Sequence, residues 1–100
     1  MIDIVYRMAY QIKKYSYIQA EKLGVKIKPS HKADKKIDVF DYNDQYICSI
    51  GDKNYPDFPT YIAMYGLEFA KERRRLYRIR HNKEKDNLGS PGYYAYYLLW

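Results

Sequence analysis

Residues 36–50, KIDVFDYNDQYICSI, decide the fold of this chain. Two runs rich in β-branched and aromatic residues, Lys36–Asp41 and Tyr46–Ile50, are separated by four residues that include Asn43 and Asp44. Runs of this composition favour strands, and such a short polar connection is typical of a hairpin turn. The stretch therefore predicts two antiparallel strands joined by a tight turn.

Outward from the hairpin, a short alternating run at Val25–Lys28 predicts a third strand, which Pro29 stops. The sheet is expected to end at Gly51–Asp52, before a loop that two prolines hold in shape. Residues 25–50 are thus expected to form a small three-stranded antiparallel sheet.

The segment Asp3–Leu23 predicts a helix by the spacing of its apolar residues, which are Val5, Met8, Ala9, Ile12 and Tyr15. Gly24 stands where a left-handed cap would end that helix. Strict alternation of apolar residues over positions 2–12 is the competing signal, since that is the period of a strand. The length of the segment favours the helix.

Three helices are predicted in the second half of the chain. The first has Thr60 as its N-cap and runs to Tyr65, where Gly66 breaks it. The second extends from Leu67 to Lys85. The capping residue Ser90, followed by Pro91, then starts the last helix, Pro91–Trp100.

Together these elements predict one α+β domain over residues 1–100, because a chain of this length is too short to bury two separate cores. The N-terminal helix lies in 1–23, the small three-stranded antiparallel sheet in 25–50 and the helical part in 60–100. We expect the helices to cover one face of the sheet, with the long basic helix packed across it and a short aromatic helix at the C-terminus.

The chain is basic, since 18 Lys and Arg against 12 Asp and Glu give a net charge of +6. An acidic middle segment, 34–67, lies between basic segments at 1–33 and 68–89. This arrangement favours pairing within the chain and leaves basic surface for an anionic partner.

Several chemistries lack the residues that they require. The lone Cys48 excludes an internal disulfide, and its apolar neighbours indicate a buried side chain rather than a reactive thiol. The two histidines, His31 and His81, are too few and too far apart in sequence for a metal centre. Acidic residues around Asp38 alternate with apolar ones, as on the solvent face of a sheet. We therefore expect no metal, no cofactor and no enzymatic activity.

The segment Glu68–Asp86 carries the clearest functional pattern. At about 100° per residue, five basic side chains fall within roughly 80° of arc on one side of the predicted helix, and these are Lys71, Arg74, Arg78, His81 and Lys85. Phe69, Leu76 and Ile79 lie on another side and are expected to face the sheet. The basic side can lie along the phosphate backbone of DNA or RNA, where each cation releases a condensed counterion. A merely solvated charged face is the alternative.

Arg73 and Arg80 lie one heptad apart, close to the expected core side of the same helix. Arginines at the edge of a core need acceptors, and the acidic middle segment offers them. We expect ion pairs that hold the helix on the sheet, with a ligand site as the alternative.

The last helix is uncharged and rich in tyrosine, and Tyr93, Tyr97 and Trp100 share one of its faces by i, i+4, i+7 spacing. One side of this helix is expected to pack on the core. The remaining aromatic surface exceeds what a core of this size needs, so we expect a protein interface there, used for self-association or for docking on another protein. Complete burial in the core is the alternative.

Five segments stand in a characteristic order: VKIKPS at 25–30, KIDVF at 36–40, SIGD at 49–52 with Tyr55 and Asp57, RRRLYRIRH at 73–81, and the closing Leu99–Trp100. As a set they resemble a family of small basic proteins of unknown function from large DNA viruses and some phages. Ile50 stands where that family has Phe before glycine. The resemblance covers residues 25–100 and implies a viral origin and a compact α+β fold, without an activity.

No charged leader with an apolar run and a cleavage site opens the chain, and no apolar stretch reaches about 18 residues. We therefore expect an intracellular protein, in the host cytoplasm or the virion, without a membrane partner. The leading hypothesis is a non-enzymatic viral or phage accessory protein that binds the nucleic-acid phosphate backbone through its basic helix. The alternative is a virion structural or assembly protein that binds other virion proteins, or forms a homo-oligomer, through its aromatic C-terminal helix.

Overall fold

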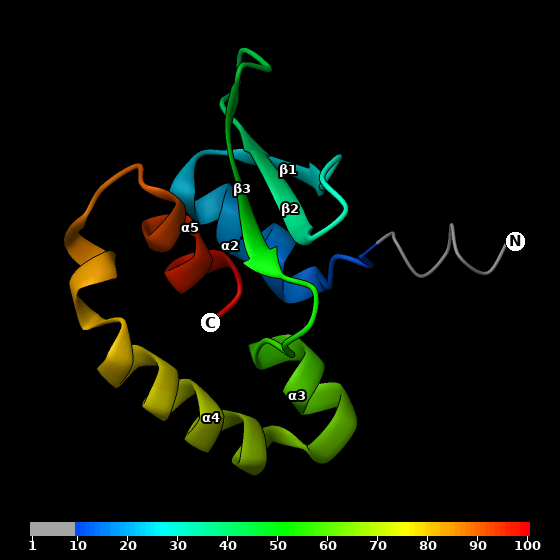
Figure 1. Cartoon of the computed structure of the whole chain (residues 1–100), viewed down its shortest axis with the longest axis vertical. Coiled ribbons are helices and arrows are strands. Elements are labelled where there is room, and N and C mark those ends of the chain that lie inside the picture. The colour runs from blue at the N-terminus through cyan, green and yellow to red at the C-terminus, as the bar shows by residue number, and fades with distance from the viewer. Residues whose placement is uncertain (1–9) are drawn as a thin grey trace, which may run out of the picture.

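The computed structural model describes residues 10–100, which form a three-stranded antiparallel sheet and four α-helices (Figure 1). The mixed α+β class and the three-stranded sheet confirm the predicted fold. In chain order the elements are α2 (Lys14–Leu23), β1 (Lys26–Pro29), β2 (Lys35–Phe40), β3 (Tyr46–Asp52), α3 (Phe58–Tyr65), α4 (Leu67–Arg80), the 3-10 helix η1 (Asn82–Asp86) and α5 (Pro91–Leu98).

The hairpin of β2 and β3 forms where the sequence predicts it, and β2 is the central strand of the order β1-β2-β3. Its turn is held by Asp41, whose Oδ1 accepts the backbone N–H groups of Asn43 at 2.8 Å and Gln45 at 2.9 Å. Asp44 takes a positive φ of 62°, which a short polar residue tolerates. The sequence of the turn therefore fixes the register of the two strands.

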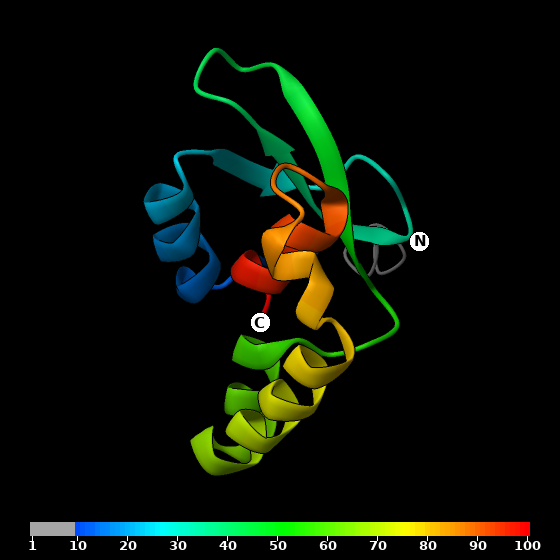
Figure 2. The same cartoon turned by 90° about the vertical axis from the view of Figure 1, so that its left-hand side faces the viewer.

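The core lies between the sheet and two helices, α2 and α5. Ile37, Val39 and Ile50 from the sheet meet Leu98 and Leu99 from the C-terminal segment, and all five side chains are at most 2% exposed. Figures 1 and 2 show α5 in the middle of the molecule, with the sheet on one side of it and the α3–α4 pair on the other. The helix that comes last in the sequence is thus the central one in the fold.

The end of α2 and the start of α5 lie where local sequence signals predict them. Gly24 ends α2 in the left-handed conformation, with φ of 73°, and Ser90 caps α5 by accepting the backbone N–H of Tyr93. The predicted cap of α3 is wrong, because Asp57 rather than Thr60 is the N-cap. The Asp57 carboxylate accepts the N–H of Thr60 at 3.0 Å, so the helix begins at Phe58.

The helix predicted over Asp3–Leu23 is shorter in the described part of the chain, where it begins at Lys14. The portion of that prediction on residues 1–9 lies outside the described residues. Tyr10 donates its hydroxyl hydrogen to Asp57 Oδ2 at 2.6 Å, and Ile12 packs against the core. These tertiary contacts override the helical spacing before Lys14.

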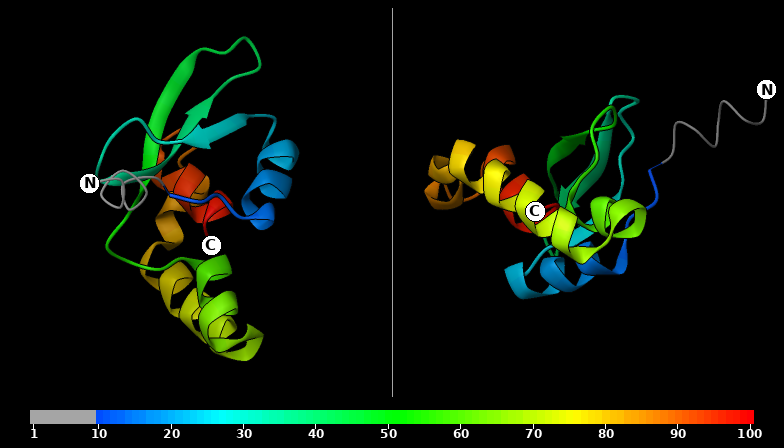
Figure 3. Two further views of the ribbon diagram at one scale, coloured as in Figure 1. Left: turned by 90° about the vertical axis from the view of Figure 1, so that its right-hand side faces the viewer. Right: turned by 90° about the horizontal axis from the view of Figure 1, so that it is seen from below.

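The long basic helix differs from its prediction in its end and in its packing. It ends at Arg80, before η1, and its principal partner is α3 rather than the sheet (Figures 1 and 3). Phe69 and Ile79, expected to face the sheet, are 46% and 62% exposed, whereas Ala70 is fully buried. The reason is that α5 already covers the sheet, and the small Ala70 allows close approach to α3.

Gly51 occupies a position that only glycine fits. Its φ is +84°, and a Cβ there would lie 2.9 Å from Leu99 Cδ1 and 2.9 Å from Lys36 Cδ. Gly51→Ala is therefore expected to lower the free energy of unfolding by about 2–3 kcal/mol, through backbone strain and overpacking. Gly89→Ala is the matched control, since φ there is +81° but no described atom lies within 4 Å, and strain alone costs about 1 kcal/mol. Urea unfolding measures both, and equal losses would contradict the steric argument.

Candidate nucleic-acid interface

The two acidic residues of α4 are paired within the helix. Glu68 lies 3.6 Å from Lys71 Nζ, and Glu72 accepts a bidentate pair of hydrogen bonds from Arg75 at 2.7 and 3.0 Å. Four further cations of the helix have no carboxylate partner among residues 10–100, and these are Arg73, Arg74, Arg78 and Arg80. The basic helix therefore carries an excess of positive charge that the described residues do not balance.

Part of the predicted basic stripe lines one shallow groove of about 660 Å³ on α4, which we call the outer groove. Lys71, Arg74 and Arg78 come together there, joined by Arg75, which sequence reasoning did not include. His81 is separated from them, because it ends α4 and stacks on Tyr77 with ring centroids 4.2 Å apart. Lys85 lies in η1 instead of on the helix. The structure thus brings together three of the five predicted residues.

Arg74 and Arg78 are half-buried, so the stripe is not the merely solvated charged face that was the alternative. The Arg74 guanidinium lies 3.9 Å from the centre of the Phe58 ring, and Arg78 lies 5.3 Å from that of Tyr96. Arg78 also donates a hydrogen bond to the main-chain oxygen of Trp100 at 3.0 Å. A guanidinium stacked on a ring keeps its N–H edge, so an anion in the outer groove can still be bound.

The ion pairs predicted for Arg73 and Arg80 are absent from the described part of the chain, and both side chains are exposed. The side of α4 that faces its neighbours is not the predicted one. The Arg73 guanidinium therefore lies 5.5 Å from the centre of the Tyr61 ring and not beside an aspartate. The two arginines line a second hollow on another side of the helix. The ion-pair prediction is therefore wrong for the described residues, and the alternative of a ligand site stays a prediction.

The different surroundings of Arg78 and Arg80 predict different effects on stability. Arg78→Ala removes a part-buried hydrogen bond and a ring contact, and is expected to cost about 1–3 kcal/mol. Arg80→Ala is its matched control on the same helix and should cost under about 0.5 kcal/mol, as for a typical surface change. Thermal melts compare the two variants. A larger loss for Arg80→Ala would contradict the placement of the helix faces.

The aromatic residues of α5 are largely enclosed. Tyr94 and Tyr96 are buried, and Tyr93, Tyr97 and Trp100, predicted to form an interface, are half-buried. Trp100 stacks on Tyr77 with centroids 4.3 Å apart and planes 8° apart. Four exposed apolar side chains cluster instead where α3 meets α4, at Met64, Tyr65, Leu67 and Phe69. The aromatic helix therefore packs mainly inward, and a separate exposed apolar patch lies at the α3–α4 junction.

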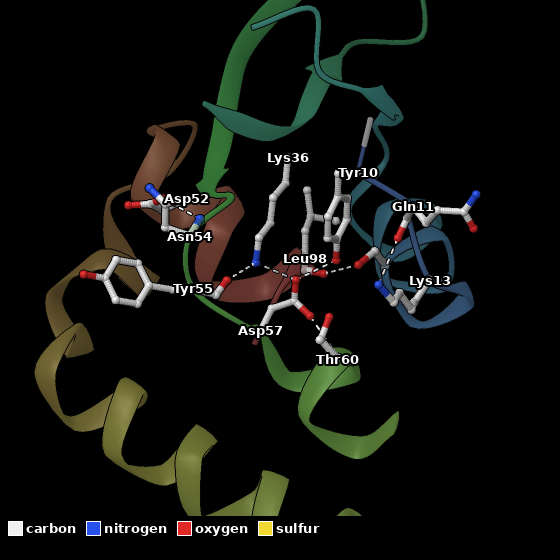
Figure 4. A network of polar contacts seen from close by, with 11 residues as sticks. Tyr10, Gln11, Lys13, Lys36, Asp52, Asn54, Tyr55, Asp57, Thr60 and Leu98 are labelled. Atoms are coloured by element: carbon white, nitrogen blue, oxygen red, sulfur yellow. Dashed lines mark hydrogen bonds and ion pairs between the residues drawn. The ribbon is translucent and has the colours of Figure 1, made fainter. Parts of the chain in front are cut away.

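The sequence did not predict the buried ion pair between Lys36 in β2 and Asp57 at the start of α3 (Figure 4). Lys36 Nζ lies 2.8 Å from Asp57 Oδ2 and donates to the carbonyl of Tyr55 at 2.6 Å, with side chains 5% and 1% exposed. Burial opposes ionisation of Asp57, but the Lys36 ammonium outweighs it and lowers the pKa of the carboxyl. The pair ties β2 to the start of α3. No local pattern marks it, because its two residues are far apart in sequence.

The prediction that Asp38 lies on the solvent face of the sheet is wrong. The side chain is 4% exposed and accepts hydrogen bonds at 2.6 Å from the hydroxyls of Ser30 and Ser49, while His31 contacts it through both its backbone and its ring. Burial opposes its ionisation, but the bonds from His31, Ser30 and Ser49 outweigh it and hold the pKa well below the ordinary value. Asp38 is thus a structural residue.

Comparison of the chain with known protein families, with curated protein sequences and with solved structures gave no match. Across residues 10–100, none of the helices has both the length and the apolar character to cross a bilayer. The same residues contain no cluster of three or more His, Cys, Asp or Glu side chains arranged to hold a metal ion.

Proposed function

We propose that this chain is a non-enzymatic nucleic-acid-binding protein that uses α4 to contact the phosphate backbone of DNA or RNA. The observation that carries the proposal is the set of four arginines on one helix that have no Asp or Glu partner in the described residues: Arg73, Arg74, Arg80 and Arg78, the last of which also donates to the main-chain oxygen of Trp100. A phosphate backbone supplies anions at regular intervals and takes the place of the missing counter-charges. The resemblance to small viral proteins accords with an accessory role in the host cytoplasm or the virion.

The position of the arginines supports a ligand that extends along the helix rather than a single ion. They lie on two sides of α4, in the outer groove and in the second hollow, from Arg73 to Arg80. At about 1.5 Å per residue this spans roughly 10 Å, which exceeds the spacing of neighbouring phosphates in a strand. Contacts with rings hold three of the guanidinium groups, those of Arg73, Arg74 and Arg78, in place before binding.

The test is a salt-titrated binding measurement on labelled single-stranded and duplex DNA of arbitrary sequence. We expect binding at low salt with little sequence preference and, for four phosphate contacts, a log–log slope of about −3 on single strands and −4 on duplex. An absence of binding at low salt would overturn the proposal.

A matched pair of variants locates the interaction on α4. Arg73→Gln with Arg80→Gln removes two exposed charges from α4, while Lys14→Gln with Lys22→Gln removes two exposed charges from α2. The first double variant is expected to reduce the steepness of the single-strand slope by about 1.4, and the second to change it little. Equal effects would show that the net charge of the chain, and not α4, governs binding.

A further inference from the structure

The second hollow is a cavity of about 430 Å³ between α4 and the ends of β2 and β3, a volume in the range of pockets that take small molecules. We call it the cationic cavity. Its walls combine basic side chains of the sheet and α4 with aromatic side chains of the β3–α3 loop, α3 and the C-terminal segment, among them Lys35, Arg73, Arg80, Tyr55, Tyr61 and Trp100.

The charge of the cavity favours an anion. Arg73 and Arg80 reach it without a carboxylate partner, and Lys36, which also lines it, is already neutralised by Asp57. Within the described part of the chain, Asp52 is the only acidic residue on its wall, and its Oδ1 accepts the backbone N–H of Asn54 at 2.9 Å. Positive charges thus exceed negative ones, and an anionic group near Arg73 and Arg80 would balance them.

The aromatic side chains that line the cavity differ in their contacts: Tyr77 is stacked on other rings, whereas Tyr55 is exposed. The Tyr77 ring is stacked between Trp100 and His81, with centroids 4.3 and 4.2 Å away, and burial together with Glu84 raises its pKa to about 12, so it is uncharged. Tyr55 is 68% exposed at the rim and contacts no other aromatic ring among residues 10–100. In Figure 4 its side chain points away from the Lys36–Asp57 pair.

We propose that the cationic cavity binds a nucleoside phosphate, with the phosphate against Arg73 and Arg80 and the base against the aromatic wall at Tyr55. Cations beside an exposed ring match both parts of such a ligand, since every base has a face that stacks on an aromatic side chain. Where it concerns nucleic acid, this inference rests on the proposed function. It specifies the ligand of the cavity as an unpaired nucleotide of a single strand. A base inside a duplex is covered by its neighbours and is not free to stack.

Trp100 provides a direct reporter, because it is the single tryptophan of the chain and it lines the cavity. Intrinsic tryptophan fluorescence is followed during titration with adenosine 5′-monophosphate and, separately, with a single-stranded oligonucleotide and a hairpin duplex. We expect the single strand to bind at least about tenfold more tightly than the duplex and to change the Trp100 emission.

Variants at the rim separate stacking from charge. Tyr55→Leu is expected to weaken single-strand binding by about tenfold, while Tyr55→Phe keeps the ring and binds as the unsubstituted chain does. Tyr17→Leu is the control and should change nothing, because Tyr17 is also exposed but lies on α2 and does not line the cavity. None of these side chains belongs to the core, so folding is retained.

The outcomes distinguish this inference from the proposed function. Equal binding of duplex and single strand that Tyr55→Leu leaves unchanged would overturn the inference while the proposed function stands. Binding of the free nucleotide with loss in Tyr55→Leu, but without oligonucleotide binding, would support the cavity and overturn the proposed function. No response to any of the three ligands would overturn both.

Discussion

Lys36→Met is expected to destabilise the fold by about 3–5 kcal/mol, because it leaves a buried carboxylate without its cation. Methionine has a similar length and fills the same space, so the loss reports the charge rather than a cavity. Asp57, 1% exposed, would keep its bonds from Tyr10 and Thr60 but lose the ammonium at 2.8 Å. For a domain of this size a loss of this magnitude lowers the melting temperature by at least about 10 °C.

The exposed pair of Lys26 and Asp44 provides the control. Its atoms lie 3.0 Å apart, but the side chains are 42% and 70% exposed, so solvent already screens the interaction. Lys26→Met should therefore melt close to the unsubstituted chain. If Lys36→Met melted with it, the buried pair would not be what joins β2 to α3.

Asp38→Ala is the second substitution with a large expected effect, about 3–4 kcal/mol in the free energy of unfolding. It removes an ionised acceptor that three residues share, and a hydrogen bond to a charged group contributes about 1.5–3 kcal/mol. The hydroxyls of Ser30 and Ser49 would lose this acceptor inside the fold. Asp34→Ala, at an exposed position in the neighbouring loop, is the control in the same urea titration, and an equally large loss there would contradict the assignment.

The pH dependence of stability follows from the same carboxylate. The folded pKa of Asp38 lies below its ordinary 3.8, so the unfolded chain takes up the proton first as the pH falls. Its contribution to stability is therefore complete above pH 3.8 and is lost progressively below that value. Below pH 3.8 the free energy of unfolding of the Asp38→Ala variant should therefore fall less steeply with decreasing pH than that of the unsubstituted chain. The same pH dependence in both proteins would contradict the lowered pKa of Asp38.

Local signals in the sequence were sufficient for the hairpin, the end of α2 at Gly24 and the start of α5 at Ser90. Each depends on residues within a few positions, such as the Asp41 carboxylate and the N–H groups of its own turn. Lys36 and Asp57, by contrast, meet only after the chain has folded. Nothing in the alternation around Lys36 distinguishes a buried ammonium from an exposed one.

The face of α4 was misassigned for a physical reason. Apolar side chains such as Phe69 and Ile79 were expected to turn inward, yet the inward positions hold Ala70 and the stems of Arg74 and Arg78. Long arginine side chains can cover apolar surface and stack on rings, so hydropathy alone does not rank them correctly. The sequence predicted that basic residues gather on this helix, but it did not predict which arginines lack an Asp or Glu partner among the described residues.

The central position of α5 has a consequence for how the molecule opens. Ser16 Oγ bonds the carbonyl of Leu98 at 2.6 Å, across 82 positions of sequence, so α5 cannot leave without dismantling the core around it. The α3–α4 pair packs chiefly on itself and carries several exposed apolar residues, among them Met64, Leu67 and Phe69. We therefore expect amide protons of α5 and β2 to exchange with solvent only through global unfolding, and those of α4 to exchange through smaller openings. In that case the arginines lie on a segment that opens at a lower free energy than the centre of the fold.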